Sequence, residues 1–470
     1  MRKYLFMLIV LSVLLLGVKP VSAQIPDSYE SSINVTNVSD SAGTITLTFY
    51  NQDGTIEDTL TEAIAAYETK WYSTLPVTDF DGSMVISSSV PLASMGMLKG
   101  QNAVGTSISY ASYVGASDGN PTVYLPLLMK DNYGFNTFYY VQNTSSANVD
   151  VTVEYSDGTG TSISGLKPGA SAKIDNYDET HSETHFAAEL NATGNIAVVV
   201  VEYSDDTIGK QLYSYNGFGL GATNPIFPLI NENNYGYWTS ANIQNIGTVD
   251  TEVTLTYTPS LMGTACTETQ TIPAGEKRDF ASYAFRWDPT LHGYPYPIST
   301  TCTLGETFVG SAVVTTNSNS QPLVGIVNQL NQTDDPNKGA ALMSRNVSLA
   351  SDMVVYPYLQ QWFGSQHWWT SWTIINVSGS TLSAGDISCH VTGSNSSGPV
   401  DTNITNPEAL ADGEGWLQQF YWDQGPLGVG FIGGAVCTSS SGDIVGTMNI
   451  LGEDVGVEYD ALGVYEGINP

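Results

Sequence analysis

The stretch Tyr124-Leu-Pro-Leu-Leu128 recurs as Ile226-Phe-Pro-Leu-Ile230, and the residues that follow the two prolines also correspond. Each copy continues to a Tyr-Gly pair, then to a Gln-Asn pair, and then to a tyrosine, with an offset of 102 residues at every landmark. A fixed offset without a gap indicates an internal repeat. The corresponding residues are Pro126 and Pro228, Tyr133 and Tyr235, Asn143 and Asn245, and Tyr155 and Tyr257.

Less regular copies flank these two. In the first copy, Asn37 is followed twelve residues later by Phe49, where the two regular copies have tyrosine. In the last copy, the spacing from Pro357 to Asn376 is two residues longer than that from Pro126 to Asn143. A second recurrent segment begins with Gly82, Asn195, Gly310 or Gly433 and continues into a short apolar strand, and we expect these four to be equivalent. The sequence therefore predicts four units, spanning residues 31–118, 122–222, 225–346 and 353–468.

The pattern within a unit is typical of β-strands. Val149, Val151, Val153 and Tyr155 alternate with polar residues, so one face of the strand is apolar. Turn pairs such as Asp157-Gly158 separate the runs. Roughly seven short strands in about 100 residues is typical of an immunoglobulin-like sandwich, so we predict an all-β fold of four tandem sandwiches.

These features resemble the immunoglobulin-like repeats of bacterial cell-surface and secreted proteins. The similarity lies in the Gln-Asn strand, the Pro-Gly or Ala-Gly turn and the Gly-Ser-Ala-Val-Val segment at Gly310. It extends over nearly the whole chain after residue 23. It implies an architecture and no particular chemistry, because such repeats serve as spacers, adhesins and coat subunits.

The first residues predict export. Arg2 and Lys3 precede an apolar run, and Val21-Ser-Ala23 provides the small residues of a signal-peptidase site. We expect residues 1–23 to be removed and the protein to be secreted and associated with the cell surface; a retained N-terminal helix is the alternative. No later apolar run reaches the length of a membrane span.

The chain is strongly acidic, with 46 Asp and Glu against 14 Lys and Arg and a net charge of −32. Such a surface repels nucleic acids and anionic membranes, so we expect neither as a partner. Only 13% of the residues are charged, which indicates an ordered polar β composition and not an acidic disordered tail.

Four cysteines are consistent with export, since disulfides persist in oxidising compartments. Their division between the last two units favours the pairs Cys266–Cys302 and Cys389–Cys437, although other connectivities are formally open. A zinc site is the competing interpretation, but no Cys-x-x-Cys spacing is present.

Calcium is the cofactor that the acidic composition makes plausible. Asp79-Phe-Asp81-Gly82 resembles the start of an alternating-aspartate loop but lacks the later ligands. The pairs Asp205-Asp206 and Asp334-Asp335 could chelate a cation at a junction between units, with solvated turns as the alternative. His181-Ser-Glu-Thr-His185 has its glutamate misplaced for a metalloprotease motif, and we expect a solvated loop there.

A tryptophan-rich stretch suggests a binding surface. Indole faces can stack on sugars, and Trp368 and Trp372 share one strand face while Trp369 takes the other. Packing in a core or between units is the alternative for these residues. The candidate glycan-binding residues are Trp362, Trp368, Trp369 and Trp372.

No catalytic set stands out, and neither a phosphate-binding loop nor a dinucleotide pattern is present. We therefore expect a non-catalytic structural or assembly protein, a rod or coat element that contacts other copies of itself or other surface proteins. The alternative is an adhesin or glycan-binding module that uses the tryptophan-rich stretch.

Overall fold

The computed structural model describes residues 28–102, 107–117, 119–204, 211–317, 319–331, 338–343, 345–346, 350–421, 425–453 and 462–469. Their regular structure is β-strand apart from η1 (Ser282–Arg286), a single π-helical turn. The prediction of an all-β chain is confirmed, whereas the predicted leader lies outside the described residues. No helix in the described part of the chain is long and apolar enough to cross a membrane.

Consecutive strands form four groups, which we call lobes 1 to 4. Lobe 1 has two sheets, of strand order β4-β1-β6-β7 and β3-β2-β5, and Val35, Leu47 and Phe49 are buried between them. Its strands are β1 (Ser28–Asn37), β2 (Gly43–Asn51), β3 (Ile56–Ile64), β4 (Thr69–Tyr72), β5 (Gly82–Ser88), β6 (Leu92–Gln101) and β7 (Ser107–Val114).

Lobe 2 differs because its strands form one continuous sheet. The long strand β13 pairs through its first half with β8 and β10 and through its second half with β9 and β14, so it belongs to both layers. The strands are β8 (Asn120–Met129), β9 (Phe135–Asn143), β10 (Val149–Tyr155), β11 (Gly160–Leu166), β12 (Ser171–Asp175), β13 (His185–Ser204) and β14 (Leu212–Asn216).

This strand corrects one alignment made from the sequence. Ile196 in β13 pairs with Asn143, as Leu92 pairs with Asn37, Leu323 with Asn245 and Ile444 with Asn376. The segment at Asn195 therefore corresponds to the strand after the one that begins near Gly82, Gly310 and Gly433. The apolar composition of both strands concealed the shift.

Lobe 3 contains a six-stranded sheet, β20-β18-β17-β21-β15-β24, and a four-stranded sheet, β19-β16-β22-β23. Its strands are β15 (Pro225–Glu232), β16 (Tyr237–Asn245), β17 (Thr251–Met262), β18 (Cys266–Ile272), β19 (Lys277–Phe280), β20 (Ser299–Thr300), β21 (Phe308–Thr316), β22 (Leu323–Asn331), β23 (Lys338–Met343) and β24 (Arg345–Asn346).

Lobe 4 contains two four-stranded sheets, β25-β30-β27-β28 and β29-β26-β31-β32. Its strands are β25 (Met353–Gln361), β26 (Trp368–Asn376), β27 (Ile387–Asn395), β28 (Gly398–Thr405), β29 (Gly415–Gln419), β30 (Phe431–Ser439), β31 (Ile444–Gly452) and β32 (Leu462–Glu466). The ladders that join its strands are antiparallel.

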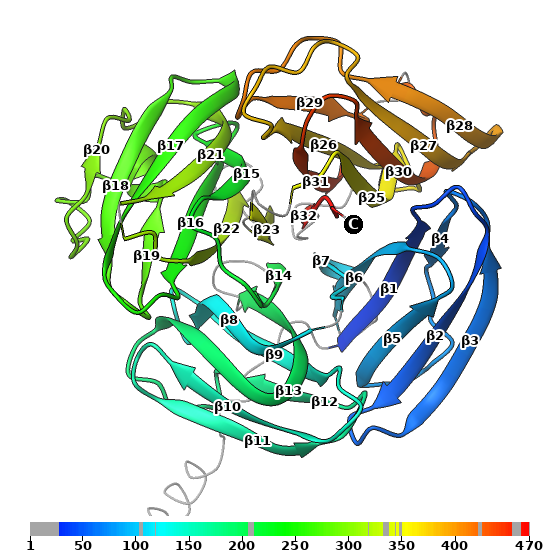
Figure 1. Ribbon diagram of the computed structural model, residues 1–470, viewed down its shortest axis with the longest axis horizontal. Helices are drawn as coiled ribbons and strands as arrows, with labels where there is room; N and C mark the ends of the chain where they lie inside the picture. Colours follow the sequence, from blue (N-terminus) through cyan, green and yellow to red (C-terminus); the bar gives the residue numbers. More distant parts are fainter. Residues whose placement is uncertain are drawn as a thin grey trace, which may run out of the picture.

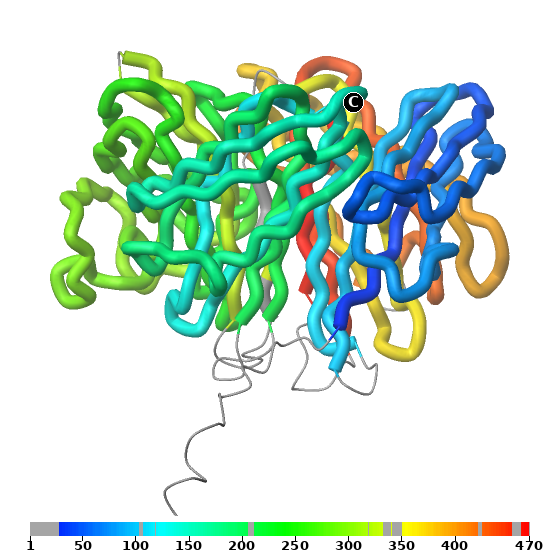
Figure 2. Tube along the Cα trace, turned by 90° about the horizontal axis from the view of Figure 1, so that it is seen from below, coloured from blue at the N-terminus to red at the C-terminus, as the bar shows by residue number. Residues whose placement is uncertain are grey.

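The four lobes form a closed ring. Figure 1 shows lobe 1 in blue beside lobe 4 in orange and red, and Figure 2 shows the lobes side by side in one layer. Each lobe contributes one strand to the centre of the ring: β7, β14, β23 and β32. There, β7 and β23 each contact both β14 and β32. Side chains add to these contacts, since the Ser214 hydroxyl donates to Ser112 O at 3.0 Å and the Ser112 hydroxyl donates to Val464 O at 3.0 Å.

One recurrent asparagine organises each lobe. The Asn143 amide nitrogen donates to Ala147 O and Leu166 O, both at 2.8 Å, and its side-chain oxygen accepts the Ser145 backbone N–H at 2.7 Å. We call this arrangement the asparagine corner. It binds three backbone groups of two chain segments, which explains why this residue recurs. Equivalent hydrogen bonds are made by Asn37, Asn245 and Asn376.

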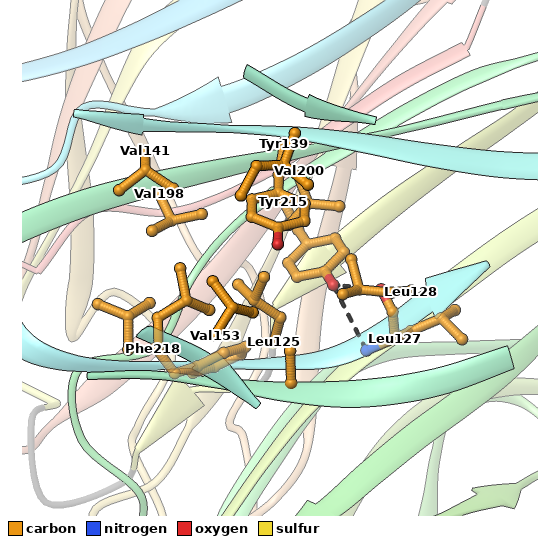
Figure 3. Close-up of a cluster of buried hydrophobic side chains, with 14 of the residues drawn as sticks. Leu125, Leu127, Leu128, Tyr139, Val141, Val153, Val198, Val200, Tyr215 and Phe218 are labelled. Atoms are coloured by element: carbon orange, nitrogen blue, oxygen red, sulfur yellow. Dashed lines mark hydrogen bonds between the residues drawn. The ribbon is translucent and has the colours of Figure 1, made fainter. Parts of the chain in front are cut away.

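The main hydrophobic cores of lobes 2, 3 and 4 each extend across a boundary between lobes. The lobe 2 core, part of which is drawn in Figure 3 around Tyr139 and Tyr215, includes residues of β16 and β22 from lobe 3. The lobe 3 core includes residues of β32, and the lobe 4 core includes residues of β6 and β7. The main cluster of lobe 1 contains residues of lobe 1 alone.

Two disulfides join the pairs that the sequence favours, Cys266–Cys302 and Cys389–Cys437. Cys389 and Cys437 lie directly opposite each other on β27 and β30, with their Cα atoms 3.8 Å apart. Closing loops of 36 and 48 residues is worth roughly 3–4 kcal/mol each in the chain-entropy treatment.

Candidate ligand-binding groove

A groove of about 490 Å³ lies at the seam where lobe 1 meets lobe 4. Its volume is within the range of small-molecule sites. Lobe 1 contributes residues of β1, of β4 and of the turn before β4, whereas lobe 4 contributes β27, β28, β30 and their connections. The lining residues are Asn34, Ala66, Tyr67, Glu68, Thr69, Trp71, Thr392, Gly393, Ser394, Pro399, Val400, Asp401, Ile432 and Gly433.

The groove is positioned by the alternation of β1. Ile33 and Val35 enter the lobe 1 core, so Asn34 between them faces the other side of the sheet, which is the side toward lobe 4. On the neighbouring strand β4, Trp71 lies directly opposite Asn34 in the antiparallel register. One polar and one aromatic side chain are therefore held next to each other on paired strands.

Asn34 carries an unused hydrogen-bonding group. It is 1% exposed, and among the described residues neither its amide nitrogen nor its amide oxygen has a hydrogen-bond partner. A buried amide without partners costs about 1–3 kcal/mol, which is recovered if a ligand or water supplies one donor and one acceptor. A hydroxyl group can supply both.

Two aromatic residues border the groove. Trp71 is 39% exposed, and its ring meets Phe363 of lobe 4 edge-on at 5.7 Å. Tyr67 O accepts a 2.8 Å hydrogen bond from the Thr392 hydroxyl, and the Tyr67 ring lies edge-on to His390 at 5.3 Å. These contacts fix both rings across the seam while leaving part of the indole open to a ligand.

The charged groups of the groove are acidic. Asp401 is exposed and lies 2.8 Å from the His390 Nε2 atom. Glu68 accepts the Ala65 backbone N–H at 2.6 Å and has Lys70 Nζ 3.9 Å away. Two carboxylates disfavour anionic ligands and accept hydrogen bonds from hydroxyls, so the site suits a neutral polyhydroxylated molecule.

Three of the four tryptophans of the predicted platform, those of β26, are buried. Trp372 is fully buried and stacks on Tyr356, and Trp368 lies in the same lobe 4 core. Trp369, on the opposite strand face, is also buried and donates from its indole nitrogen to Glu453 at 2.7 Å. Trp362 is half-buried and stacks on His367. The alternative of core packing therefore describes the three residues of β26.

The calcium prediction rests on three pairs of aspartates, of which the structure describes one. The Asp81 oxygens accept hydrogen bonds from Gln52 at 2.8 Å and from Tyr140 at 2.9 Å, so Asp81 joins lobe 1 to lobe 2. Within the described ranges, Asp79 and Asp81 belong to no group of three metal-binding side chains. Asp205, Asp206, Asp334 and Asp335 lie outside the described residues.

The predicted loop is present, and Ser182, Glu183 and Thr184 are exposed, but the side chain of His181 is closed off from solvent. Its ring stacks on Phe186 with centroids 4.0 Å apart, and its Nδ1 atom lies 3.2 Å from an Asp157 oxygen. Burial lowers the pKa of His181, and the Asp157 carboxylate opposes this effect. His185 instead approaches Asp279, with a distance of 3.7 Å between Nε2 and Oδ2, so the two histidines have separate partners.

Three glutamates are fully buried: Glu202, Glu232 and Glu268. Burial raises the pKa of Glu202 and Glu232 to about 8 and that of Glu268 to about 7. Glu268 accepts hydrogen bonds from the Tyr257 hydroxyl at 2.7 Å and from Ala281 N at 2.8 Å, which holds Ala281 in a left-handed conformation with φ of 69°. Their complete burial separates all three carboxylates from solvent, so we assign them a structural role.

A literal match to Gly-x-Ser-x-Gly occurs at Gly115–Gly119. The nucleophile elbow that this motif forms in hydrolases is a turn from a strand to a helix. Here the segment connects strand β7 to strand β8, so the structural context of a nucleophile elbow is not met.

Sequence reasoning did not single out Asn34, Tyr67 or Trp71. A usable signal was present at Asn34, a polar residue between two apolar residues of a predicted core strand. Its role depends on the groove residues of lobe 4, which are more than 350 residues away along the chain and adjacent only because the ring closes.

Comparisons with known proteins add little to the assignment. No protein family matches the sequence, and no curated protein matches it. A crystal structure titled Thermotoga maritima 1070 matches 22% of this chain and 96% of its own chain, with 10% identity and a TM-score of 0.19. A similarity at this level carries no argument about function.

Proposed function

We propose that this protein is a secreted, non-catalytic scaffold of the cell surface, built from four immunoglobulin-like repeat units that close into a ring. The paired sheets of the lobes and the recurrent asparagine corner support the repeat interpretation. The two disulfides are compatible with an extracellular location.

Ring closure is the observation that carries the proposal. Contacts of β7 with β32 join the first lobe to the last, and three hydrophobic cores extend from one lobe into the next. Each lobe is therefore fixed by two neighbours, which suits a rigid platform that presents loops and grooves to partners. The partners that we expect are other copies of the chain or other surface proteins.

The same observation changes the expected mode of assembly. A rod of repeats needs free end surfaces on its first and last units, but in the ring these two surfaces contact each other. Extension by simple end-to-end stacking of lobes is therefore disfavoured, and contacts between copies would use the outer faces of the ring.

Light scattering of the purified protein without its leader tests this proposal. We expect a discrete species whose mass is constant over a wide range of protein concentration, because a closed ring offers no open-ended head-to-tail contact. Growth into ever larger species as concentration rises would contradict the closed-ring scaffold.

The same measurement with added calcium tests the junction aspartates, since a calcium-dependent mass would indicate a site among them.

A second candidate function, binding of neutral glycans, is favoured by the groove between lobes 1 and 4. Trp71→Ala should weaken binding of a neutral oligosaccharide about tenfold or more, because an exposed tryptophan in a pocket commonly dominates such contacts. Titration calorimetry against a panel of oligosaccharides measures the effect. Tyr133→Ala is the matched control, since Tyr133 is an aromatic residue that is 89% exposed on lobe 2. Equal affinities of Trp71→Ala and the parent protein would exclude the groove as the binding site.

A further inference from the structure

Lobes 2, 3 and 4 each contain a strand that has no counterpart among the described residues of lobe 1. β8, β15 and β25 precede the asparagine-corner strand of their lobes and pair with β13, β21 and β30 respectively. In lobe 1, the strand equivalent to the partners β13, β21 and β30 is β5. One edge of β5 pairs with β2. Among the described residues, no strand pairs with the other edge of β5.

The equivalence of β5, β21 and β30 is supported by their backbone geometry. Gly82, Gly310 and Gly433 each follow a phenylalanine by two residues. A side chain at any of these glycines would meet a carbonyl oxygen of the neighbouring strand at 2.1 Å: Tyr50 O, Thr258 O and Thr392 O respectively. Identical close approaches at the same strand pair identify the same position in three lobes.

The burial of β5 shows the consequence of the missing neighbour. Residues 433–437 of β30 are all buried, whereas residues 82–86 of β5 are all half-buried. Met84 and Ile86 face the lobe 1 core but remain only partly buried within it. Lobe 2 contacts this region through Tyr140, which hydrogen-bonds Asp81 just before β5, and through Gly169 O, which accepts a hydrogen bond from the Ser83 hydroxyl of β5, and not by a paired strand.

An unpaired edge beside a half-covered core can accept an added strand, which gains backbone hydrogen bonds and buries its alternate side chains. In lobes 2, 3 and 4, the equivalent edge is paired with β8, β15 and β25, so these three strands indicate which sequence the edge of β5 would accept. They share an apolar–proline–apolar sequence, and the proline lies at an irregularity of the ladder, where a missing N–H is tolerated. The sequences are Tyr124-Leu-Pro-Leu-Leu128, Ile226-Phe-Pro-Leu-Ile230 and Tyr356-Pro-Tyr-Leu359.

We propose that the free edge of β5 binds an extended apolar–proline–apolar strand donated by another polypeptide. Cleavage before Gln24, as the sequence predicts, leaves four residues ahead of β1, too few for a strand of eight to ten residues and its turn. Cleavage there would therefore leave too little chain ahead of β1 to complete lobe 1 from the N-terminus. This inference does not depend on the scaffold proposal, because it concerns one edge of lobe 1 and is measured by cross-linking.

The competing occupant is the leader itself. Pro20 lies 17 residues before Asn37, the same spacing as that from Pro126 to Asn143 and from Pro228 to Asn245. A retained leader would thus carry a proline at the matching position. Intact mass measurement of the exported protein distinguishes the two occupants before any binding experiment: loss of residues 1–23 agrees with the proposal, and their retention overturns it.

Cross-linking tests the donated strand directly. In lobe 3, Val313 lies opposite Ile226, and the equivalent residue of lobe 1 is Val85. The probe is a synthetic peptide of residues 224–232 with cysteine in place of Ile226, its sulfur carried as a 2-thiopyridyl disulfide, incubated with Val85→Cys protein that lacks its leader. The protein thiolate attacks the peptide sulfur and pyridine-2-thione leaves, so no separate oxidant is needed. The described cysteines are all in disulfides, so the new thiol reports its own reaction.

Val313→Cys is the matched control, because it places the same change at the same position of an edge that β15 already occupies. We expect at least tenfold more mixed disulfide with Val85→Cys than with Val313→Cys, and at least tenfold slower amide exchange in β5 of the unmodified protein when the parent peptide is added. Equal cross-linking of the two variants, or unchanged exchange in β5, would overturn the proposal.

Discussion

Replacing Asn143 with aspartate should lower the free energy of unfolding by about 3–5 kcal/mol, because the carboxylate removes the donors of two carbonyl groups, one of them buried, and places a charge beside them. The Asn143 amide group donates to Ala147 O and Leu166 O, and Leu166 is buried. The change in volume is negligible, so the loss isolates the hydrogen bonds of the corner. Urea denaturation followed by tryptophan fluorescence measures it.

Asn403→Asp is the control for this prediction. Asn403 is exposed on β28 and makes no described side-chain hydrogen bond, so its replacement should change stability by less than about 0.5 kcal/mol. A loss of similar size in both variants would mean that added negative charge, and not the asparagine corner, determines the effect.

Replacing Glu202 with glutamine should stabilise the protein at pH 8 by about 3–5 kcal/mol and leave its stability at pH 4.5 nearly unchanged. Glu202 is fully buried where lobe 2 meets lobe 3, and Asn328 of lobe 3 donates to its Oε2 atom at 2.7 Å. Its Oε1 atom has no hydrogen-bond partner. Burial raises the pKa of Glu202 from 4.5 to about 8, against the opposing effect of Lys277.

The direction of the pH dependence follows from the two pKa values. The folded state holds a proton on Glu202 between pH 4.5 and 8, whereas the unfolded state releases it near pH 4.5. The stabilising effect of this proton is complete below pH 4.5 and is lost as pH rises toward 8. Glutamine cannot ionise, so the variant should lose less stability over this interval than the parent protein.

Denaturation midpoints at pH 4.5, 6 and 8 measure the difference, with Glu154→Gln on the exposed face of β10 as the control. Parallel pH profiles for the parent protein and Glu202→Gln would show that Glu202 is ionised in the folded state. Because Glu232 and Glu268 are present in both proteins, their own titrations cancel in the comparison.

The sequence predicts features that depend on short segments. The period of two in residues 149–155 predicts a strand, and the structure places β10 there, with Val149, Val151, Val153 and Tyr155 buried. The fixed position of Asn143 and Asn245 indicates a shared role, and the asparagine corner supplies it. Local alternation and local hydrogen bonds determine these features, so they are visible without tertiary information.

Features that depend on distant segments were not predictable in the same way. Trp368 and Trp372 alternate as a binding strand would, but the opposite sheet and Tyr110 of lobe 1 cover them. The groove at Asn34 requires lobes 1 and 4 to meet. A repeat pattern is equally compatible with a rod and a ring, because the contacts that close the ring involve groups of no distinctive type, such as the Ser112 hydroxyl and the backbone carbonyl of Val464.

The closure of the ring also bears on the order in which the chain can fold. The hydrogen bond from Ser112 to Val464 spans 352 residues, and β32 contacts both β7 and β23. Contacts of such long sequence separation form slowly, because a large loop must close before they stabilise anything. During synthesis, lobe 3 therefore emerges before lobe 4 can cover it, and the lobe 3 core, which includes Leu462 and Val464, closes only when β32 arrives. Residues 462–466 thus govern when the folding intermediate stops being vulnerable to aggregation and proteolysis.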